Sequence, residues 1–264
     1  MIFDCFTFFN ESITLDFRLN YLSPFVDYFV IVESGITFSG NPKAFSAGEV
    51  ISCQPQSIQD KCRLIQLNHW PPNKFSAKCN WEREYYQRNA ILQGLHDAKS
   101  LDDFVFITDV DEIPNPRMFS QFFSLASRYT GLNICMDMFY YEANNWMFEG
   151  NKPLVWTFPK VVSAPYLYLP QTIRMSFREY PYLLNCGWHF SYMGGVQAIK
   201  AKIHSYAHQE NNTDDILKSV ATNLDTKKDL FSRDYSFKSY PLSKLPELML
   251  SNKLYHDFFL PSLS

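Results

Sequence analysis

The feature that most constrains this chain is a pair of short, almost wholly apolar runs, YFVIV at Tyr28–Val32 and FVFIT at Phe104–Thr108. Both runs are rich in β-branched and aromatic residues, and neither alternates apolar with polar positions. Strands of this kind are typically buried on both faces, as when helices cover both sides of a parallel sheet. The chain is therefore expected to place helices between its strands.

Segments with helical character do separate the predicted strands. A first strand at Ile2–Phe6 is followed by a helix that Asn10 or Ser12 can cap and Pro24 can stop. The pattern continues with a weaker strand at Leu64–Leu67, a helix at Trp81–Leu95, a helix from Pro116 to Tyr129 and a strand at Leu132–Tyr141. This alternation predicts an α/β fold with a Rossmann-like, mostly parallel sheet flanked by helices.

The second half of the sequence has a different character. Prolines interrupt short alternating segments after about residue 150, and helical patterns return at 197–206, 214–223 and 243–251. Because no linker or internal repeat is visible, we expect one domain over 1–264. Its first half, 1–145, would bind the ligand, and its second half, 146–264, would pack onto the first as a lid.

Composition excludes several classes of protein. The chain has 264 residues and 46% hydrophobic residues, enough for a sizeable core, and its net charge of −3 argues against a nucleic-acid surface. No run is apolar and long enough for a signal peptide or a membrane span, so a cytoplasmic location is expected. The six cysteines form no Cys-x-x-Cys pair and are expected to be reduced, buried thiols.

Polar side chains follow the predicted strands where each one ends. In a parallel sheet the carboxyl ends of neighbouring strands meet at one edge, and ligands bind there. The residues at these ends are Asn10 and Glu11 after the first strand, Glu33 after the second, and Asp109, Asp111 and Glu112 after FVFIT.

Asp109 and Asp111 form an Asp-x-Asp pair at the tip of a strand, where both side chains can be solvated. Carboxylate oxygens suit Mg²⁺ or Mn²⁺, which would in turn bridge a diphosphate. Alternatively, the two aspartates only cap the turn that leads into the helix at Pro116.

Two further residue types allow a functional and a structural interpretation. Arg83 and Arg88, on the helix before FVFIT, could hold a phosphate or a carboxylate, or could pair with Glu82 and Glu84 on a solvated face. His189, in the aromatic segment GWHFSY, could be a ligand or a core residue. Glycine-rich dinucleotide, Walker A and Gly-x-Ser-x-Gly motifs are absent from the sequence.

Several segments, in order, resemble glycosyltransferase family 17. They are FDCFTFFNE, VDYFVIVES with TFSGNPK, WEREYYQRNAI, ITDVDEIP and GWHFSYMGG, and the resemblance extends from Met1 to about Ser251. It implies a GT-A-like fold and transfer of a sugar, GlcNAc in the animal member, from a UDP donor to a glycan with inversion. The sequence lacks the N-terminal anchor and stem of that member, so it resembles a compact bacterial or viral-type enzyme.

The resemblance also implies roles for individual residues. Asp109 and Asp111 match the family's Asp-x-Asp position, and His189 matches the histidine of its Gly-Trp-His segment and would complete a site for Mn²⁺ or Mg²⁺. The residues expected to bind the UDP-sugar are Asn10, Glu11, Glu33, Lys43, Arg88 and Asp109. Inversion in one displacement needs a carboxylate to accept the proton of the acceptor hydroxyl. Glu142, Asp137 and Glu112 are candidates, with a preference for Glu142 because it follows the next strand.

Two other functions use the same features. A metal-dependent nucleotidyltransferase or phosphohydrolase could be built on the carboxylate cluster, although such enzymes commonly recruit two metals and more acids. A non-catalytic carbohydrate-binding protein would use the aromatic content of 17% for stacking on sugars, but it would not need the Asp-x-Asp pair.

Overall fold

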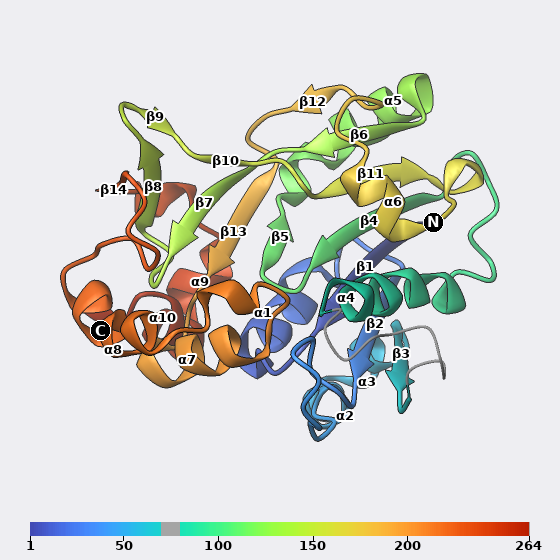
Figure 1. Cartoon of the computed structure of the whole chain (residues 1–264). Coiled ribbons are helices and arrows are strands. Elements are labelled where there is room, and N and C mark those ends of the chain that lie inside the picture. The colour runs from blue at the N-terminus through green and yellow to red at the C-terminus, as the bar shows by residue number, and fades with distance from the viewer. Residues whose placement is uncertain (70–79, 264) are drawn as a thin grey trace.

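The computed structural model describes residues 1–69 and 80–263, which form two seven-stranded sheets flanked by helices (Figure 1). The first sheet has the strand order β12-β6-β11-β4-β1-β2-β3. Strands β4, β1, β2 and β3 run parallel, as the sequence predicts, whereas β11 is antiparallel to both of its neighbours. The strands are β1 (Ile2–Phe8), β2 (Tyr28–Ser34), β3 (Cys62–Leu67), β4 (Phe104–Asp109), β6 (Gly131–Ile134), β11 (Lys160–Ser163) and β12 (Tyr182–Leu183).

The central strands of this sheet are buried on both faces. In β1, Phe6 and Phe8 belong to one core, while Phe3 and Cys5 belong to the core on the opposite face. The alternation in β2 and β4 is the same, which explains the apolar runs in the sequence. The first core includes α1 (Ser12–Leu22), α2 (Ala47–Ser52) and α5 (Phe119–Tyr129); the second includes the 3₁₀ turn η1 (Ala90–Gly94) after α4 (Asn80–Asn89), and α6 (Pro170–Met175).

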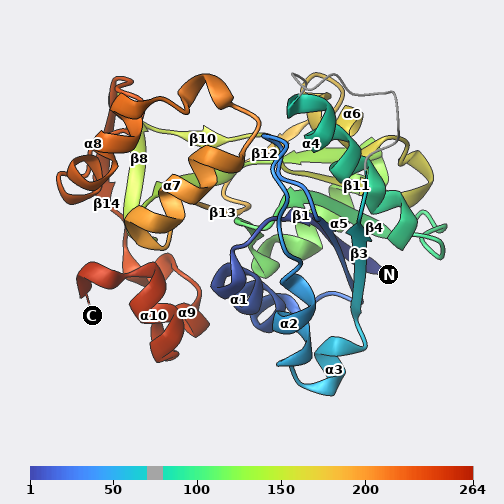
Figure 2. The ribbon, with the colours of Figure 1, turned by 60° about the horizontal axis from the view of Figure 1, so that its bottom comes forward.

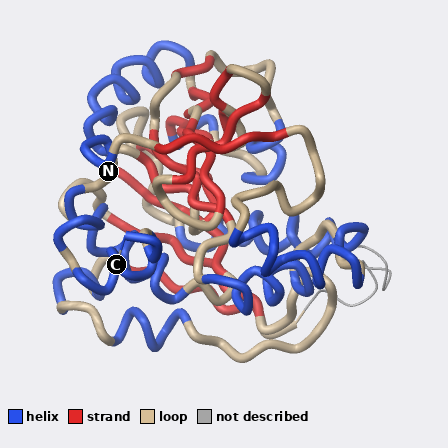
Figure 3. The backbone as a smooth tube through the Cα atoms, turned by 90° about the vertical axis from the view of Figure 1, so that its left-hand side faces the viewer, coloured by secondary structure: helices blue, strands red, loops and turns tan. Residues whose placement is uncertain are grey.

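The second sheet is mostly antiparallel and has the order β14-β8-β7-β13-β5. Its strands are β5 (Glu112–Pro114), β7 (Met136–Tyr140), β8 (Asn145–Glu149), β13 (Gly187–Ser191) and β14 (Tyr235–Ser239), with β9 (Lys152–Pro153) and β10 (Val155–Trp156) paired to β8 and β7. Helices α7 (Gly195–Ser205) and α8 (Asp214–Asp225) pack on one face, and α9 (Glu247–Ser251) and α10 (Lys253–Phe259) on the other. Figure 3 shows the strands running through the middle of the molecule with helices around them.

The remaining elements are short. They are the helix α3 (Gln56–Gln59) and the 3₁₀ turns η2 (Pro116–Met118), η3 (Ala164–Tyr166), η4 (Gln209–Asn211), η5 (Leu242–Lys244) and η6 (Pro261–Leu263).

The chain crosses between the sheets more than once. The predicted single strand at Leu132–Tyr141 is wrong, because β6 ends at Ile134 in the first sheet and β7 begins at Met136 in the second. Cys135 lies between them, and its backbone bonds to Leu183 and Cys186 instead of continuing either ladder. The sheets therefore interleave along the sequence, and neither is confined to one side of the expected division near residue 145.

The second sheet closes tightly on the segment that follows β4. Gly187 begins β13 with φ +155°, and a Cβ built on it would lie 2.1 Å from the carbonyl oxygen of Ile113 in β5. Only glycine allows this approach. His189, two residues later, is thereby placed opposite Glu112.

Two expectations from composition concern the whole chain. Five cysteines are free thiols in the described part, and only Cys5, Cys135 and Cys186 are buried; Cys79 lies outside the described residues. Within residues 1–69 and 80–263, no helix has both the length and the apolar character needed to cross a membrane.

Candidate active site

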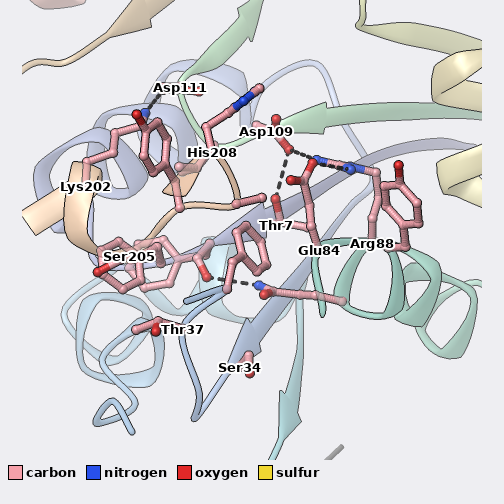
Figure 4. Close-up of a pocket in the computed structure, with 18 of the residues that line it drawn as sticks. Thr7, Ser34, Thr37, Glu84, Arg88, Asp109, Asp111, Lys202, Ser205 and His208 are labelled. Carbon is pink, nitrogen blue, oxygen red and sulfur yellow. Dashed lines mark hydrogen bonds and ion pairs between the residues drawn. The ribbon is translucent and has the colours of Figure 1, made fainter. Parts of the chain in front are cut away.

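A cavity of about 400 Å³ lies at the carboxyl ends of the parallel strands β1, β2 and β4. Thr7 of β1, Ser34 of β2 and the Asp109–Asp111 loop after β4 all line it (Figure 4). The opposite walls come from α4, α6 and α7, and Figure 2 shows α4 and α7 on the two sides of the loop that follows β2. The cavity therefore opens where the sequence predicts a ligand.

Helix α4 turns its charged face inward. Arg88 is only 2% exposed and lines the cavity, whereas Trp81 and Tyr85 are 38% and 39% exposed at its rim. The apolar periodicity of this segment would group Trp81 and Tyr85 on the buried face, but the helix borders a polar cavity and both rings stay partly exposed. Arg83 is also buried, and it donates a hydrogen bond to the Phe38 carbonyl in the loop after β2.

Asp109 is held between two arginines. Its Oδ1 accepts hydrogen bonds from Arg88 at 2.8 Å and from Thr7 Oγ1 at 2.9 Å, and its Oδ2 accepts one from Arg174 at 2.7 Å. Burial by itself would raise the pKa of Asp109, but the guanidinium groups of Arg174 and Arg88 outweigh it and hold the pKa well below 3.8. Asp109 is therefore an anion that fixes two cations on the cavity wall.

Asp111 has different partners. Its Oδ2 lies 2.6 Å from the ammonium nitrogen of Lys202, and its Oδ1 lies 3.5 Å from His189 Nε2. Burial would raise its pKa, and the charge of Lys202 together with His189 lowers it well below 3.8. Asp111 is only 5% exposed, so the expectation that its side chain is solvated is wrong, whereas the side chain of Asp109 is 30% exposed.

The predicted metal ligands are only partly brought together. Asp111 and His189 share one space, but both oxygens of Asp109 are engaged by arginines. No group of three or more His, Cys, Asp or Glu suited to a metal occurs in the described residues. Mg²⁺ commonly takes one or two protein ligands and completes its shell with water and phosphate oxygens. Asp111 and His189 could be the protein ligands of such a cation, but the ammonium of Lys202 already occupies one oxygen of the Asp111 carboxylate.

Glu112 lies beneath the cavity as a fully buried anchor. Its carboxylate accepts hydrogen bonds from two nitrogens of Arg174, from Trp156 Nε1 and from the backbone N–H of Asp109. Arg174 therefore bridges Glu112 and Asp109 and ties α6 to the loop after β4.

Arg18 of α1 holds the same loop from the other side. It is fully buried and forms two hydrogen bonds with the Asp4 carboxylate and one with Thr108 Oγ1. Its Nη1 also donates to three backbone carbonyls, those of Asp109, Val110 and Glu112, at 2.8–3.1 Å. One guanidinium thus fixes the backbone of the Asp-x-Asp segment.

The expected donor-binding residues at the other strand ends have distinct positions. Glu11 lines the cavity, where burial raises its pKa against the opposing charge of Lys202. Glu33 is fully buried and pairs with Lys43, which lines the cavity. Asn10 is exposed and is not among the described lining residues.

Two of the three candidate bases lie away from this cavity. Glu142 accepts hydrogen bonds from Ser262 at 2.5 Å and Lys227 at 3.4 Å, and Asp137 accepts one from Tyr240 at 3.1 Å. Neither is among the residues that line the cavity in the described structure. With Glu112 buried, the positions of all three give no support to their role as the base.

Three functional side chains were not identified from the sequence: Arg18, Arg174 and Lys202. Each lies on a helix that is far in sequence from Asp109–Asp111, so its contact with that segment cannot be seen in the sequence. A buried partner for a helical arginine or lysine leaves no local pattern in the sequence, so periodicity could not have identified these three residues.

Comparison with known proteins identifies the family of the chain. The model of glycosyltransferase family 17 matches residues 1–262. The human and rat β-1,4-mannosyl-glycoprotein 4-β-N-acetylglucosaminyltransferases are 33% and 32% identical over 109 residues, which is 40% of this chain but 20% of theirs. A solved 4-diphosphocytidyl-2C-methyl-D-erythritol synthase from Anaerococcus prevotii covers 85% of this chain and 98% of its own, with 8% identity and a TM-score of 0.36. That likeness is too distant to bear on function.

Proposed function

The chain belongs to glycosyltransferase family 17, and from this premise we propose that it transfers a sugar, GlcNAc in the first instance, from a UDP-sugar to a hydroxyl of a glycan. The cavity at the carboxyl ends of β1, β2 and β4 receives the donor, and the fold acts as a GT-A-like scaffold. The observation that carries the proposal is the concentration of charged side chains on the wall of that cavity.

The charges on the wall are balanced before a donor enters. Among the described lining residues are four cations and four carboxylates: Lys43, Arg88, Arg174 and Lys202, and Glu11, Glu84, Asp109 and Asp111. A diphosphate adds further negative charge to this partly buried site. A divalent cation would restore the balance, which supports a metal-dependent reaction.

We assign the cation to Asp111 and His189 and the donor sugar to the neighbourhood of Arg88 and Asp109. When bound, Mn²⁺ or Mg²⁺ would neutralise charge that develops on the departing UDP. Arg88 and Arg174 would stay oriented by Asp109 while the donor is bound, because their guanidinium groups are fixed by hydrogen bonds at 2.8 and 2.7 Å.

Glu11 is better placed than the earlier candidates to accept the proton of the acceptor hydroxyl. It lines the cavity, and its Oε2 accepts hydrogen bonds from the backbone N–H groups of Phe9 and Asn10 at 3.2 and 3.0 Å. Its raised pKa makes it a stronger base than an ordinary glutamate.

Aromatic side chains at the rim suit a carbohydrate. Trp81 and His208 are in edge contact at 4.5 Å between ring centroids, and Tyr85 lies 6.4 Å from Trp81. Partly exposed aromatic rings commonly stack on the apolar face of a sugar. We therefore place a sugar ring against this rim.

Release of UDP from a panel of UDP-sugars, with Mn²⁺ and a glycan acceptor, tests the proposal. We expect release with UDP-GlcNAc, loss of release with EDTA, and loss in Asp111→Asn. Asp225→Asn, an equal change of charge at an exposed position at the end of α8, should behave as wild type. If no UDP-sugar is turned over while nucleoside triphosphates are hydrolysed, a nucleotidyltransferase or phosphohydrolase is the better assignment. Sugar binding without any turnover would favour the carbohydrate-binding protein.

A further inference from the structure

Lys202, in the second half of the chain, contacts the second aspartate of the Asp-x-Asp segment. Helix α7 brings it there after Gly194 and Gly195, which both have positive φ and turn the chain out of β13. Its side chain is 27% exposed and lines the cavity. It is therefore open to a ligand and also bound to a buried carboxylate.

The ammonium of Lys202 occupies one oxygen of the carboxylate that a divalent cation would use. Its nitrogen is 2.6 Å from Oδ2 of Asp111, and His189 approaches the other oxygen of the same carboxylate. A cation held by Asp111 and His189 would therefore lie close to the ammonium, and the two like charges would repel each other. We expect this repulsion to displace Lys202 from Asp111 when a metal binds.

The side chain of Lys202 is able to move away from Asp111. Lysine carries a compact charge on a flexible four-carbon stem, so rotation about the side-chain bonds can move its ammonium while the helix stays in place. The ammonium nitrogen also lies over the ring of Tyr192, 5.4 Å from its centroid. A diphosphate bound in the cavity would give the ammonium of Lys202 a new anion to contact.

We propose that Lys202 is a diphosphate-binding residue that occupies the cation position at Asp111 until the donor and the metal arrive. It then passes from the carboxylate to a phosphate oxygen as the metal takes its place. This inference rests on the proposed function, since it requires a donor that carries a diphosphate. If the ion pair were purely structural, Lys202 would instead remain bound to Asp111 both with and without donor and metal.

The test compares Lys202→Met and Lys202→Gln with wild type; the glutamine variant keeps a hydrogen-bond donor for Asp111. Lys200→Met is the matched control, because Lys200 lies on the same helix but is not among the described lining residues. Binding of Mn²⁺ without nucleotide is followed by the electron paramagnetic resonance signal of the free ion. Binding of UDP at saturating Mn²⁺ is followed by calorimetry, and circular dichroism checks that each variant is folded.

We expect both Lys202 variants to bind Mn²⁺ about ten-fold more tightly than wild type without nucleotide, because a competing positive charge is gone. The same variants should bind UDP about ten-fold more weakly at saturating Mn²⁺, because a phosphate contact is lost. Lys200→Met should match wild type in both. Unchanged or weaker Mn²⁺ binding by both Lys202 variants, or unchanged UDP binding, overturns the role of Lys202. Wild-type protein that binds Mn²⁺ but not UDP would instead overturn the proposed function, and with it the phosphate contact.

Discussion

Replacement of Arg18 by methionine should show how strongly the floor of the cavity depends on one buried guanidinium. Arg18 is fully buried, and methionine fills a similar volume without a donor. The change strands the Asp4 carboxylate, which is also fully buried, and removes the donor from three backbone carbonyls of the Asp-x-Asp segment.

The size of the effect follows from these contacts. Removal of one partner of a buried ion pair costs about 3–5 kcal/mol. Each stranded carbonyl adds up to about 1–3 kcal/mol, although local relaxation keeps such costs from adding in full. We expect Arg18→Met to lower the free energy of unfolding by at least about 4 kcal/mol, a large part of the roughly 5–15 kcal/mol typical of a folded protein.

A second substitution separates the ion pair from the loop. Asp4→Asn combined with Arg18→Met removes the stranded charge, so we expect the double variant to recover about 2 kcal/mol relative to the sum of the single changes. The carbonyls of Asp109 and Val110 remain without their donor. The double variant should therefore be folded at low temperature but deficient in sugar transfer.

Urea unfolding followed by tryptophan fluorescence measures the stability of wild type, of Arg18→Met, of Asp4→Asn and of the double variant. Release of UDP measures transfer. A cost below about 1 kcal/mol for Arg18→Met would refute the reasoning, since such a cost belongs to a surface substitution. Strict additivity of the two changes, or full activity in the double variant, would refute it as well.

Three further predictions follow from the site. Asp109→Asn should abolish transfer and cost about 1–3 kcal/mol, because Arg88 and Arg174 lose a shared anion but keep other partners; chemical denaturation and UDP release measure both effects. Asp109 and Asp111 have folded-state pKa values below 3.8, so they contribute stability at neutral pH that is lost as the pH falls below about 4. The urea midpoint should therefore drop less between pH 7 and pH 3 in Asp111→Asn than in wild type. Equal drops would contradict this. Gly187→Ala should cost about 3 kcal/mol or more in thermal melts because of the Ile113 carbonyl, whereas Gly150→Ala, with positive φ but no atom within 4 Å of its Cβ, should cost about 1 kcal/mol.

The sequence predicts the central sheet well for a physical reason. Burial on both faces produces continuous apolar runs, and β1, β2 and β4 coincide with the predicted strands to within two residues at each end. The same reason explains the failure at Leu132–Tyr141. Both halves of that run are buried, so the passage at Cys135 from one sheet to the other involves no change of polarity.

The site is less accessible to sequence reasoning. Asp109 and Asp111 stand out because carboxylates directly follow an apolar strand, and the resemblance adds His189. Arg88 was a candidate, but the sequence left open a solvated face for it, because a helix that borders a polar cavity buries charges that periodicity assigns to solvent. The partners that decide each carboxylate's role come from α1, α6 and α7, and such long-range contacts leave no periodic pattern.

The Asp-x-Asp segment is also one of the connections between the two sheets. Asp109 ends β4 in the first sheet, Glu112 begins β5 in the second, and only Val110 and Asp111 separate them. A rotation of one sheet against the other must change the backbone angles of those two residues, as well as those at the other crossings, such as Cys135. The outermost strands, β3 and β14, lie at the far edges and can change length without disturbing this connection. Changes of length should therefore be tolerated better at β3 and β14 than in the strands beside this connection, whose geometry positions the two aspartates.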